Sequence, residues 1–309
     1  MKRLRSLCVA LGLAAVGCDD SPVAPTSNEG SWQTLAPMPA ARQELATAVL
    51  NGLIYVIGGF DSGGQSTSSV FVYNPQSNTW STAASLPIAN NHGAAAVANG
   101  RLFAFGGVSN RAFVYNPAGN SWSEVASMNF THGDTAAVAV INNRIHVAGG
   151  SGSATQREVE VYDTTANTWT PLAPMNVGRN HCAGGTIDGK FYVVGGRGFA
   201  GSDVALEVYD PAAGTWTTRA PMPTGRSGIA AGVVNNRLYA FGGELPALHS
   251  EVESYDPVSN TWQQHPPMPT PKHGIWASII GNTVYLPGGG AAQGLGATTS
   301  HESFTVGSR

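Results

Sequence analysis

The chain has 309 residues, a formal net charge of −3, 11% charged residues and 39 glycines. This length allows one large domain or two ordinary ones, with enough residues to bury a substantial core. The near-neutral charge and the absence of long charge runs argue against a nucleic-acid-binding surface, which requires a basic patch or stripe.

The first residues resemble a bacterial export signal. Three basic residues within the first five precede an apolar run that ends at Val16, which is too short for a membrane span. The tetrapeptide that ends at Cys18 resembles the lipobox of bacterial lipoproteins, in which the cysteine becomes the lipidated first residue. We therefore expect residues 1–17 to be a lipoprotein signal peptide and Cys18 to be lipidated. A soluble periplasmic or secreted protein is the alternative.

The next segment, residues 18–31, is rich in Ser, Pro and acidic residues and almost lacks apolar ones. This composition predicts a flexible tether, which would hold the following domain away from a membrane surface. We therefore expect the protein in the cell envelope, in the outer membrane and periplasm or at the cell surface, attached to the membrane only by its lipid. If Cys18 is acylated, Cys182 has no disulfide partner in the mature chain.

The rest of the chain is built from a repeated unit. Six Gly-Gly pairs follow one another at intervals of 43 to 48 residues, and each ends an apolar run such as LIYVIGG. A turn dipeptide such as Asn51-Gly52 precedes each run, and because these residues tolerate positive φ, each predicts a tight hairpin between two strands. The pairs begin at Gly58, Gly106, Gly149, Gly195, Gly242 and Gly288.

Each unit also predicts a second pair of strands. A segment such as VFVYNP supplies a strand that ends in an aromatic residue, and in five units a Trp follows the Tyr seven residues later. Four short strands in each unit, with no helical period, indicate an antiparallel sheet repeated around an axis. The aromatic pairs are Tyr73 and Trp80, Tyr115 and Trp122, Tyr162 and Trp169, Tyr209 and Trp216, and Tyr255 and Trp262.

The Gly-Gly, Tyr-Asp-Pro and Trp signatures at these spacings resemble kelch repeats over nearly all of residues 32–309. The resemblance implies an all-β fold, a six-bladed kelch-type β-propeller. The sixth unit supplies its strands between Thr283 and Val306, with Phe304 at the Tyr position, and lacks a fourth strand. The segment from Trp32 to Leu35 matches that missing strand, so we expect the N-terminal strand to close the last blade and leave no unpaired edge.

A binding site is predicted where the residues before each first strand share a face with the loops after Gly-Gly. Sixteen residues before the pairs, four units carry a basic residue, which predicts a positively charged pocket mouth suited to an anionic or heavily hydroxylated ligand. The predicted ligand-binding residues are Arg42, Arg179, Arg226 and Lys272, together with Arg197 and Phe199 on the overlying loops. Asp61, Arg111, Arg157, Glu244 and His249 are expected on the same loops.

Fourteen residues before the Gly-Gly pairs stand Glu44, His92 and His181, which are the candidate catalytic residues. Even offsets place these and the preceding basic residues on one side of an extended strand. Small Ala residues follow at the next even offset, and Trp276 replaces one of them, so we expect Trp276 to plug or floor the channel. For the arginines, a structural role in bonding backbone carbonyls is an equal alternative.

This sequence lacks the metal-site residues of two kinds of kelch metalloenzyme. Galactose-oxidase-like copper enzymes use a further C-terminal domain and a Cys-linked Tyr, whereas Cys182 is the only Cys of this domain. Plant specifier proteins bind iron through Glu, Asp and His at four-residue intervals, and no such run occurs. No metal and no cofactor are therefore expected.

The preferred interpretation is a non-catalytic, monomeric binding domain that recognises a protein or glycan on its loop face and binds no nucleic acid. The alternative is an enzyme, because exported bacterial six-bladed kelch proteins include sialic-acid mutarotases, which use acid/base groups and an Arg. Glu44, His181 and either Arg179 or Arg226 are of the right types for this chemistry.

Overall fold

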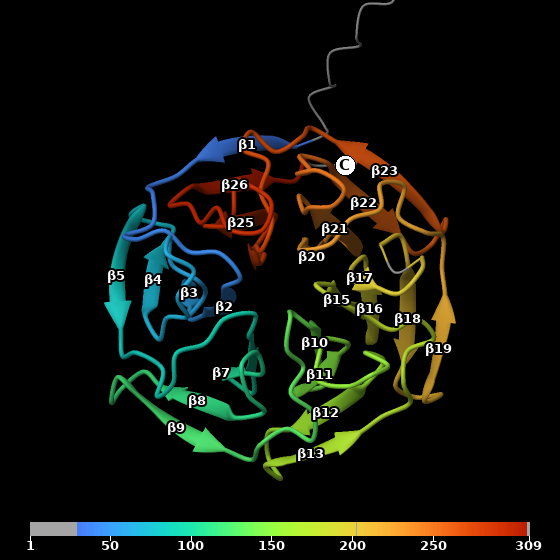
Figure 1. The fold of residues 1–309 in the computed structure, drawn as a ribbon, viewed down its shortest axis with the longest axis horizontal. Coiled ribbons are helices and arrows are strands. Elements are labelled where there is room, and N and C mark those ends of the chain that lie inside the picture. The colour runs from blue at the N-terminus through green and yellow to red at the C-terminus, as the bar shows by residue number, and fades with distance from the viewer. Residues whose placement is uncertain (1–29, 202, 308–309) are drawn as a thin grey trace, which may run out of the picture.

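The computed structural model describes residues 30–201 and 203–307. Within these residues the chain forms six four-stranded antiparallel sheets and no α-helix. The sheets are arranged as blades around a central axis, and the chain passes from one blade to the next in sequence order (Figure 1). The all-β fold and the six-bladed propeller predicted from the repeats are confirmed.

Each blade runs from an innermost first strand to an outermost fourth strand. Blades one to three contain β2 (Ala46–Leu50), β3 (Leu53–Ile57), β4 (Val70–Asn74) and β5 (Thr79–Ala83); β6 (Ala94–Ala98), β7 (Arg101–Phe105), β8 (Ala112–Asn116) and β9 (Ser121–Val125); and β10 (Ala137–Ile141), β11 (Arg144–Ala148), β12 (Val159–Asp163) and β13 (Thr168–Pro171). Blades four and five contain β15 (Ala183–Ile187), β16 (Lys190–Val194), β18 (Leu206–Asp210) and β19 (Thr215–Thr218); and β20 (Ala230–Val234), β21 (Arg237–Phe241), β22 (Val252–Asp256) and β23 (Thr261–His265).

The sixth blade joins the two ends of the described chain. It contains β24 (Ser278–Ile280), β25 (Thr283–Pro287), β26 (His301–Thr305) and, as its outermost strand, β1 (Ser31–Thr34). β1 lies antiparallel to β26, with Trp32 opposite Phe304, and the blue and red strands are neighbours in Figure 1. The predicted closure is therefore confirmed, although β1 begins and ends one residue earlier than expected.

The recurring Tyr, Asn and Trp residues join neighbouring blades in a repeated clamp. In blade one, the Tyr73 hydroxyl donates to Asn78 Oδ1, and the same oxygen accepts the backbone N–H of Ala36 from the preceding blade. Trp80 Nε1 donates to the Ala36 carbonyl, 2.9 Å away. Because Asn78 lies in the turn with a φ of 53°, a conformation that Asn tolerates, one short motif forms both the turn and the contact between blades.

The predicted signal peptide and lipidation site, Cys18, lie outside the described residues, as does the predicted tether except for Gly30 and Ser31. Among the residues that the structure describes, no helix has the length and apolarity needed to cross a membrane.

Candidate functional site

The innermost strands enclose a cavity of about 310 Å³ along the propeller axis. Its walls are formed mainly by Ala, Gly and Val from the first strand of every blade. Trp276 also lines this cavity, and it packs both against the core of blades two and three across the axis and against that of the neighbouring blade one. One end of the cavity lies next to the residues that precede the first strands, where the candidate catalytic residues are found.

These residues form a closed ring of backbone hydrogen bonds around the axis. His92 N–H donates to the Glu44 carbonyl at 2.8 Å, and Glu44 N–H donates to the Gly274 carbonyl at 2.8 Å. The same contact passes from blade to blade through Gly228, His181, Asp134 and Thr135. All of these residues have left-handed backbone conformations, with φ between 50° and 63°. Glu and His adopt such angles at a cost of about 1–2 kcal/mol each, so their use at the axis marks a constrained site.

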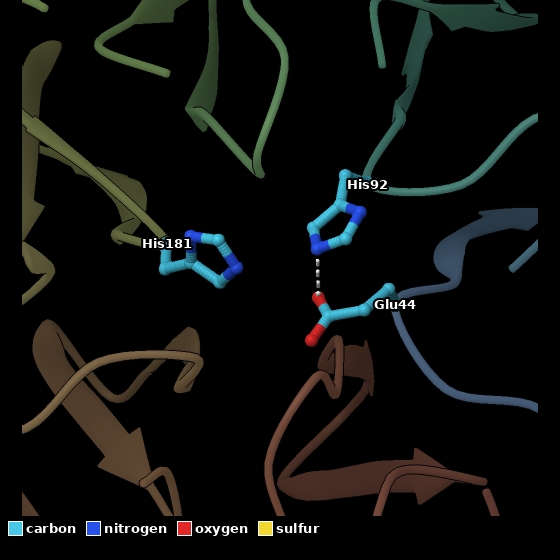
Figure 2. Close-up of side chains that lie close together, drawn as sticks. All are labelled: Glu44, His92 and His181. Atoms are coloured by element: carbon cyan, nitrogen blue, oxygen red, sulfur yellow. Dashed lines mark ion pairs between the residues drawn. The ribbon is translucent and has the colours of Figure 1, made fainter. Parts of the chain in front are cut away.

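Glu44, His92 and His181 point toward one another from three different blades (Figure 2). Glu44 Oε2 lies 3.4 Å from His92 Nε2, and the rings of His92 and His181 are 5.0 Å apart. One side-chain ligand atom from each residue lies within 4.8 Å of the other two. The predicted candidate residues therefore form one cluster at the centre of the propeller face.

The Glu44 carboxylate is enclosed by polar partners. His273 Nδ1 lies 3.4 Å from Glu44 Oε1, and Thr135 Oγ1 donates to Glu44 Oε2 at 3.4 Å. Burial raises the pKa of Glu44, but the neighbouring His92, His273 and His181 lower it by more. The net result is a pKa of about 2. The carboxyl group is therefore ionised at neutral pH. A side chain at Gly274 would collide with it, because a Cβ there would lie 2.5 Å from Glu44 Oε1.

Arg197 and Glu244 cover the cluster from the loops. The short strands β14 (Arg179–Asn180) and β17 (Arg197–Gly198) pair with Asn180 opposite Arg197. This pairing lets Arg197 Nη2 donate to His181 Nε2 at 2.7 Å, while Nη1 lies 2.7 Å from Glu244 Oε1. Burial lowers the pKa of His181 to about 4, which keeps its ring neutral and able to accept this bond.

The basic residues predicted to rim the mouth lie elsewhere. Arg179, Arg226 and Lys272 have no exposed surface. Each forms an ion pair within its own blade, with Glu207, Glu253 and Glu302. The expectation that they line a positively charged mouth is wrong, because each side chain turns between the strands of its blade and donates to backbone carbonyls there.

Arg42 has a similar place in blade one. It donates to Ser69 Oγ and stacks on Phe71, which occupies the position of the buried Glu in the later blades. Only 9% of its surface is exposed, so it too is part of the blade. Arg197 is the one predicted ligand-binding cation that the structure places beside the cluster.

Blade three contains a residue that the count from Gly-Gly missed. His132 lies next to Glu160, with 3.2 Å between His132 Nε2 and Glu160 Oε1, and takes the place of the buried basic residues of other blades. Gly133 pairs with Ser151 as Ser227 pairs with Glu244, so this blade has one extra residue, Thr135, before its first strand. Because the sequence count used the same sixteen residues before every Gly-Gly pair, it selected Gly133 in this blade instead of His132.

The remaining loop residues differ in position. Phe199 is 47% exposed and lines a shallow pocket with Arg157, whereas Arg111 pairs with Glu124 on the outer strand of its blade. His249 pairs with Glu251.

We call the side formed by the loops after the Gly-Gly pairs and by the axial cluster the loop face. The residues at the cluster that the sequence did not single out are His273, Asn91 and Asn180, which each stand fifteen residues before a Gly-Gly pair and so one position before the counted set.

Comparison with known proteins places the chain in a family. A family model of the KLHDC2/KLHL20/DRC7 kelch-repeats domain matches residues 20–183 and 108–290. The Arabidopsis thaliana F-box/kelch-repeat proteins At1g67480 and At1g27420 are 45% and 46% identical to it over 49 and 48 residues. The match spans 16% of this chain but only 13% and 14% of those proteins.

A solved structure shows the same fold over most of the chain. The structure of YjhT has a TM-score of 0.73 and 17% sequence identity, and the alignment covers 86% of this chain and 95% of that one. The repeat signatures, the six closed blades and the family match agree, and the chain belongs to the kelch-repeat family.

Proposed function

We propose that this chain is an exported, lipid-anchored kelch propeller that binds a protein or a glycan through its loop face. One observation carries the proposal. Five large apolar side chains are exposed among the described residues, and four of them lie in loops that follow a Gly-Gly pair. These four are Val108, Phe199, Leu245 and Leu295, which are 51%, 47%, 43% and 49% exposed. Because these four apolar side chains share one face of the propeller, we infer that a partner covers them there.

The loops that carry these side chains are tied to one another and to the axial cluster. Gln293 Nε2 donates to the Pro246 carbonyl at 2.9 Å, which joins the loops of blades five and six. Gly294 N–H donates to Glu244 Oε2 at 3.2 Å. A surface held in this way loses little conformational entropy when it binds a ligand.

The centre of the loop face offers both donors and acceptors. Arg197 is the most accessible of its charged groups, with 34% of its side chain exposed beside the nearly buried Glu244. A guanidinium next to a carboxylate suits the hydroxyls of a glycan or the polar backbone of a peptide. The export signal and the residues around Cys18 support placement of this face in the cell envelope.

A ligand screen with matched variants tests the binding proposal. Glycan arrays and pull-downs from envelope extracts compare the wild-type chain with a Phe199→Ser, Leu295→Ser double variant. The control is Val258→Ser, because Val258 is 95% exposed but lies in the turn between β22 and β23, on the opposite face. We expect a ligand that the wild type and the control retain and the double variant loses. Equal retention by all three chains would place binding outside the loop face.

A second candidate function is sugar ring opening of the sialic-acid mutarotase type. The contact of the ionised Glu44 with His92 favours it, because a carboxylate and an imidazole together can accept and return a proton. NMR of sialic acid tests this: accelerated mutarotation by the wild type that Glu44→Gln abolishes supports the candidate. His249→Gln, a loop-face histidine outside the cluster, is the control, and no acceleration by the wild type would eliminate the enzyme.

A further inference from the structure

The axial cluster has the composition and spacing of a metal site. Glu44, His92 and His181 supply one carboxylate oxygen and two imidazole nitrogens within 4.8 Å of one another. Two ligands bound at about 2.0–2.1 Å to a tetrahedral Zn²⁺ lie about 3.4 Å apart, which is also the distance between Glu44 Oε2 and His92 Nε2. The third ligand atom, from His181, lies within 4.8 Å of the other two and must move closer to them to bind the same ion.

Hydrogen bonds behind the two histidines orient both rings toward the centre. His92 Nδ1 lies 2.5 Å from Asn91 Oδ1, and His181 Nδ1 lies 2.6 Å from Asn180 Oδ1. An amide oxygen only accepts, so each Nδ1 carries a proton and donates it. The neighbours of each Asn fix its amide, because Asn91 Nδ2 donates to Ser66 Oγ and Asn180 Nδ2 donates to Gln156 Oε1.

The Nε2 atoms therefore face the carboxylate. Arg197 donates to His181 Nε2 at 2.7 Å, which shows that this nitrogen carries a lone pair rather than a proton. At His92, a lone pair on Nε2 would repel the Glu44 oxygen 3.4 Å away unless a proton or a metal ion lies between them. A fixed Nδ1–H and an unprotonated Nε2 are the arrangement that hydrogen-bond partners behind the ring impose on metal-binding histidines.

We propose that Glu44, His92 and His181 bind a Zn²⁺ ion at the axis of the propeller. This departs from the sequence-based expectation of no metal, because the three ligands come from three blades and form no contiguous metal-binding motif in the sequence. Arg197, which is 34% exposed and already paired with Glu244, moves from His181 when the ion binds. The fourth coordination position then opens toward the loop face, as in zinc sites with three protein ligands.

The proposal goes beyond the proposed function and does not depend on it, because the experiment needs no other ligand. The full chain is treated with a chelator and dialysed against Zn²⁺, and the bound metal is counted. We expect one Zn²⁺ per chain. Single variants Glu44→Gln, His92→Gln and His181→Gln should each lower the affinity more than 100-fold, whereas His249→Gln should leave it unchanged. Substitution by Co²⁺ should give the intense visible absorption of four- or five-coordinate cobalt rather than the weak bands of an octahedral ion.

Two further variants separate a metal site from a merely structural cluster. Asn180→Ala keeps all three ligands but frees the His181 ring, and it should weaken zinc binding by about 10- to 100-fold. Arg197→Gln removes the competing donor and should bind zinc at least as tightly as the wild type. Thermal unfolding confirms that each variant is folded. A wild type that retains no zinc, or a folded His92→Gln, His181→Gln double variant that retains it fully, overturns the proposal.

Discussion

Arg226 and Glu253 form an ion pair in which neither side chain has any exposed surface, with 2.5 Å between Nη1 and Oε2. The guanidinium also donates to the carbonyls of Gly242 and Thr224, so it joins the loop before β20 to the ends of β21 and β22. Blades four and six repeat the relationship with Arg179 and Glu207 and with Lys272 and Glu302. The buried charges therefore organise the interiors of blades four to six, and the loop face lies above them.

This arrangement predicts that Arg226→Ala lowers the free energy of unfolding by about 3–5 kcal/mol, because Glu253 is left as a buried charge without its partner. Arg111→Ala is the matched control. It removes the exposed pair with Glu124, whose side chains are 38% and 46% exposed, and should change stability little. Urea unfolding measures both, and an equal effect of the two substitutions would contradict a structural role of Arg226.

The sequence was sufficient to predict the blades because the packing between blades uses the same residue types in most of them. Each Tyr, Asn and Trp makes the same contacts around the ring, so these residues repeat in the sequence and carry a signal, as Tyr73 and Trp80 do. The closing strand was predictable for the same reason, since Trp32 donates to Pro266 as the other Trp residues donate to their neighbouring blade.

The site was predicted only in part. The side-chain alternation assumed an extended chain through residue 44, but Glu44 has a φ of 50°. Because of this bend, Arg42 points into the blade while Glu44 faces the axis, and the two side chains do not lie on one side of the chain. His273 lies one position from the counted residues, and its contact with Glu44 comes from the meeting of blades, which no spacing along the chain encodes. Asn180 is the residue before His181, and the same Asn-His pair recurs at Asn91 and His92, so this contact left a signal in the sequence that the count did not use.

Closure of the ring predicts that Trp32→Ala is as destabilising as the same change within the chain's other blades. Trp32 packs on Phe304 with ring centroids 5.0 Å apart and donates to Pro266 at 2.9 Å. Loss of this packing should cost about 3 kcal/mol. Trp262→Ala, which removes the equivalent contact with Ala220, should cost a similar amount in thermal unfolding. Gln33→Ala, on the exposed side of β1, should cost little, and if Trp32→Ala matched it, β1 would not be closing the propeller.

A buried histidine predicts how stability depends on pH. Burial lowers the pKa of His301 to about 3, because its ring packs among Tyr73 and Trp80. The unfolded chain, with an ordinary histidine pKa of about 6.5, binds a proton that the folded chain does not, so stability falls as the pH drops below that value. Between pH 7 and 5 this residue should cost about 2 kcal/mol.

His301→Phe should remove this part of the pH dependence. An aromatic ring of similar size keeps the packing with Tyr73 and carries no titratable group. Urea unfolding of both chains at pH 7 and pH 5 gives the difference directly. We expect a smaller loss of stability on acidification in the variant, and identical losses in the two chains would show that His301 does not titrate on unfolding.

Blade four lacks the clamp's asparagine, which predicts a stabilising substitution. Gly214 occupies, in blade four, the turn position that Asn78 holds in blade one, with a φ of 68° and no atom within 4 Å of a Cβ. Gly214→Asn should let the new Oδ1 accept both the Tyr209 hydroxyl and the Ala173 N–H, and raise stability by about 1 kcal/mol.

The control for this substitution is Gly189→Asn. Gly189 has nearly the same φ, 69°, and equal free space, but it lies in a hairpin turn without those two donors. The difference between the two variants isolates the hydrogen bonds from the change in backbone freedom. In a Tyr209→Phe background the gain from Gly214→Asn should shrink, because one of the two donors is gone. A gain that is unchanged by Tyr209→Phe would mean that the clamp does not act through the tyrosine.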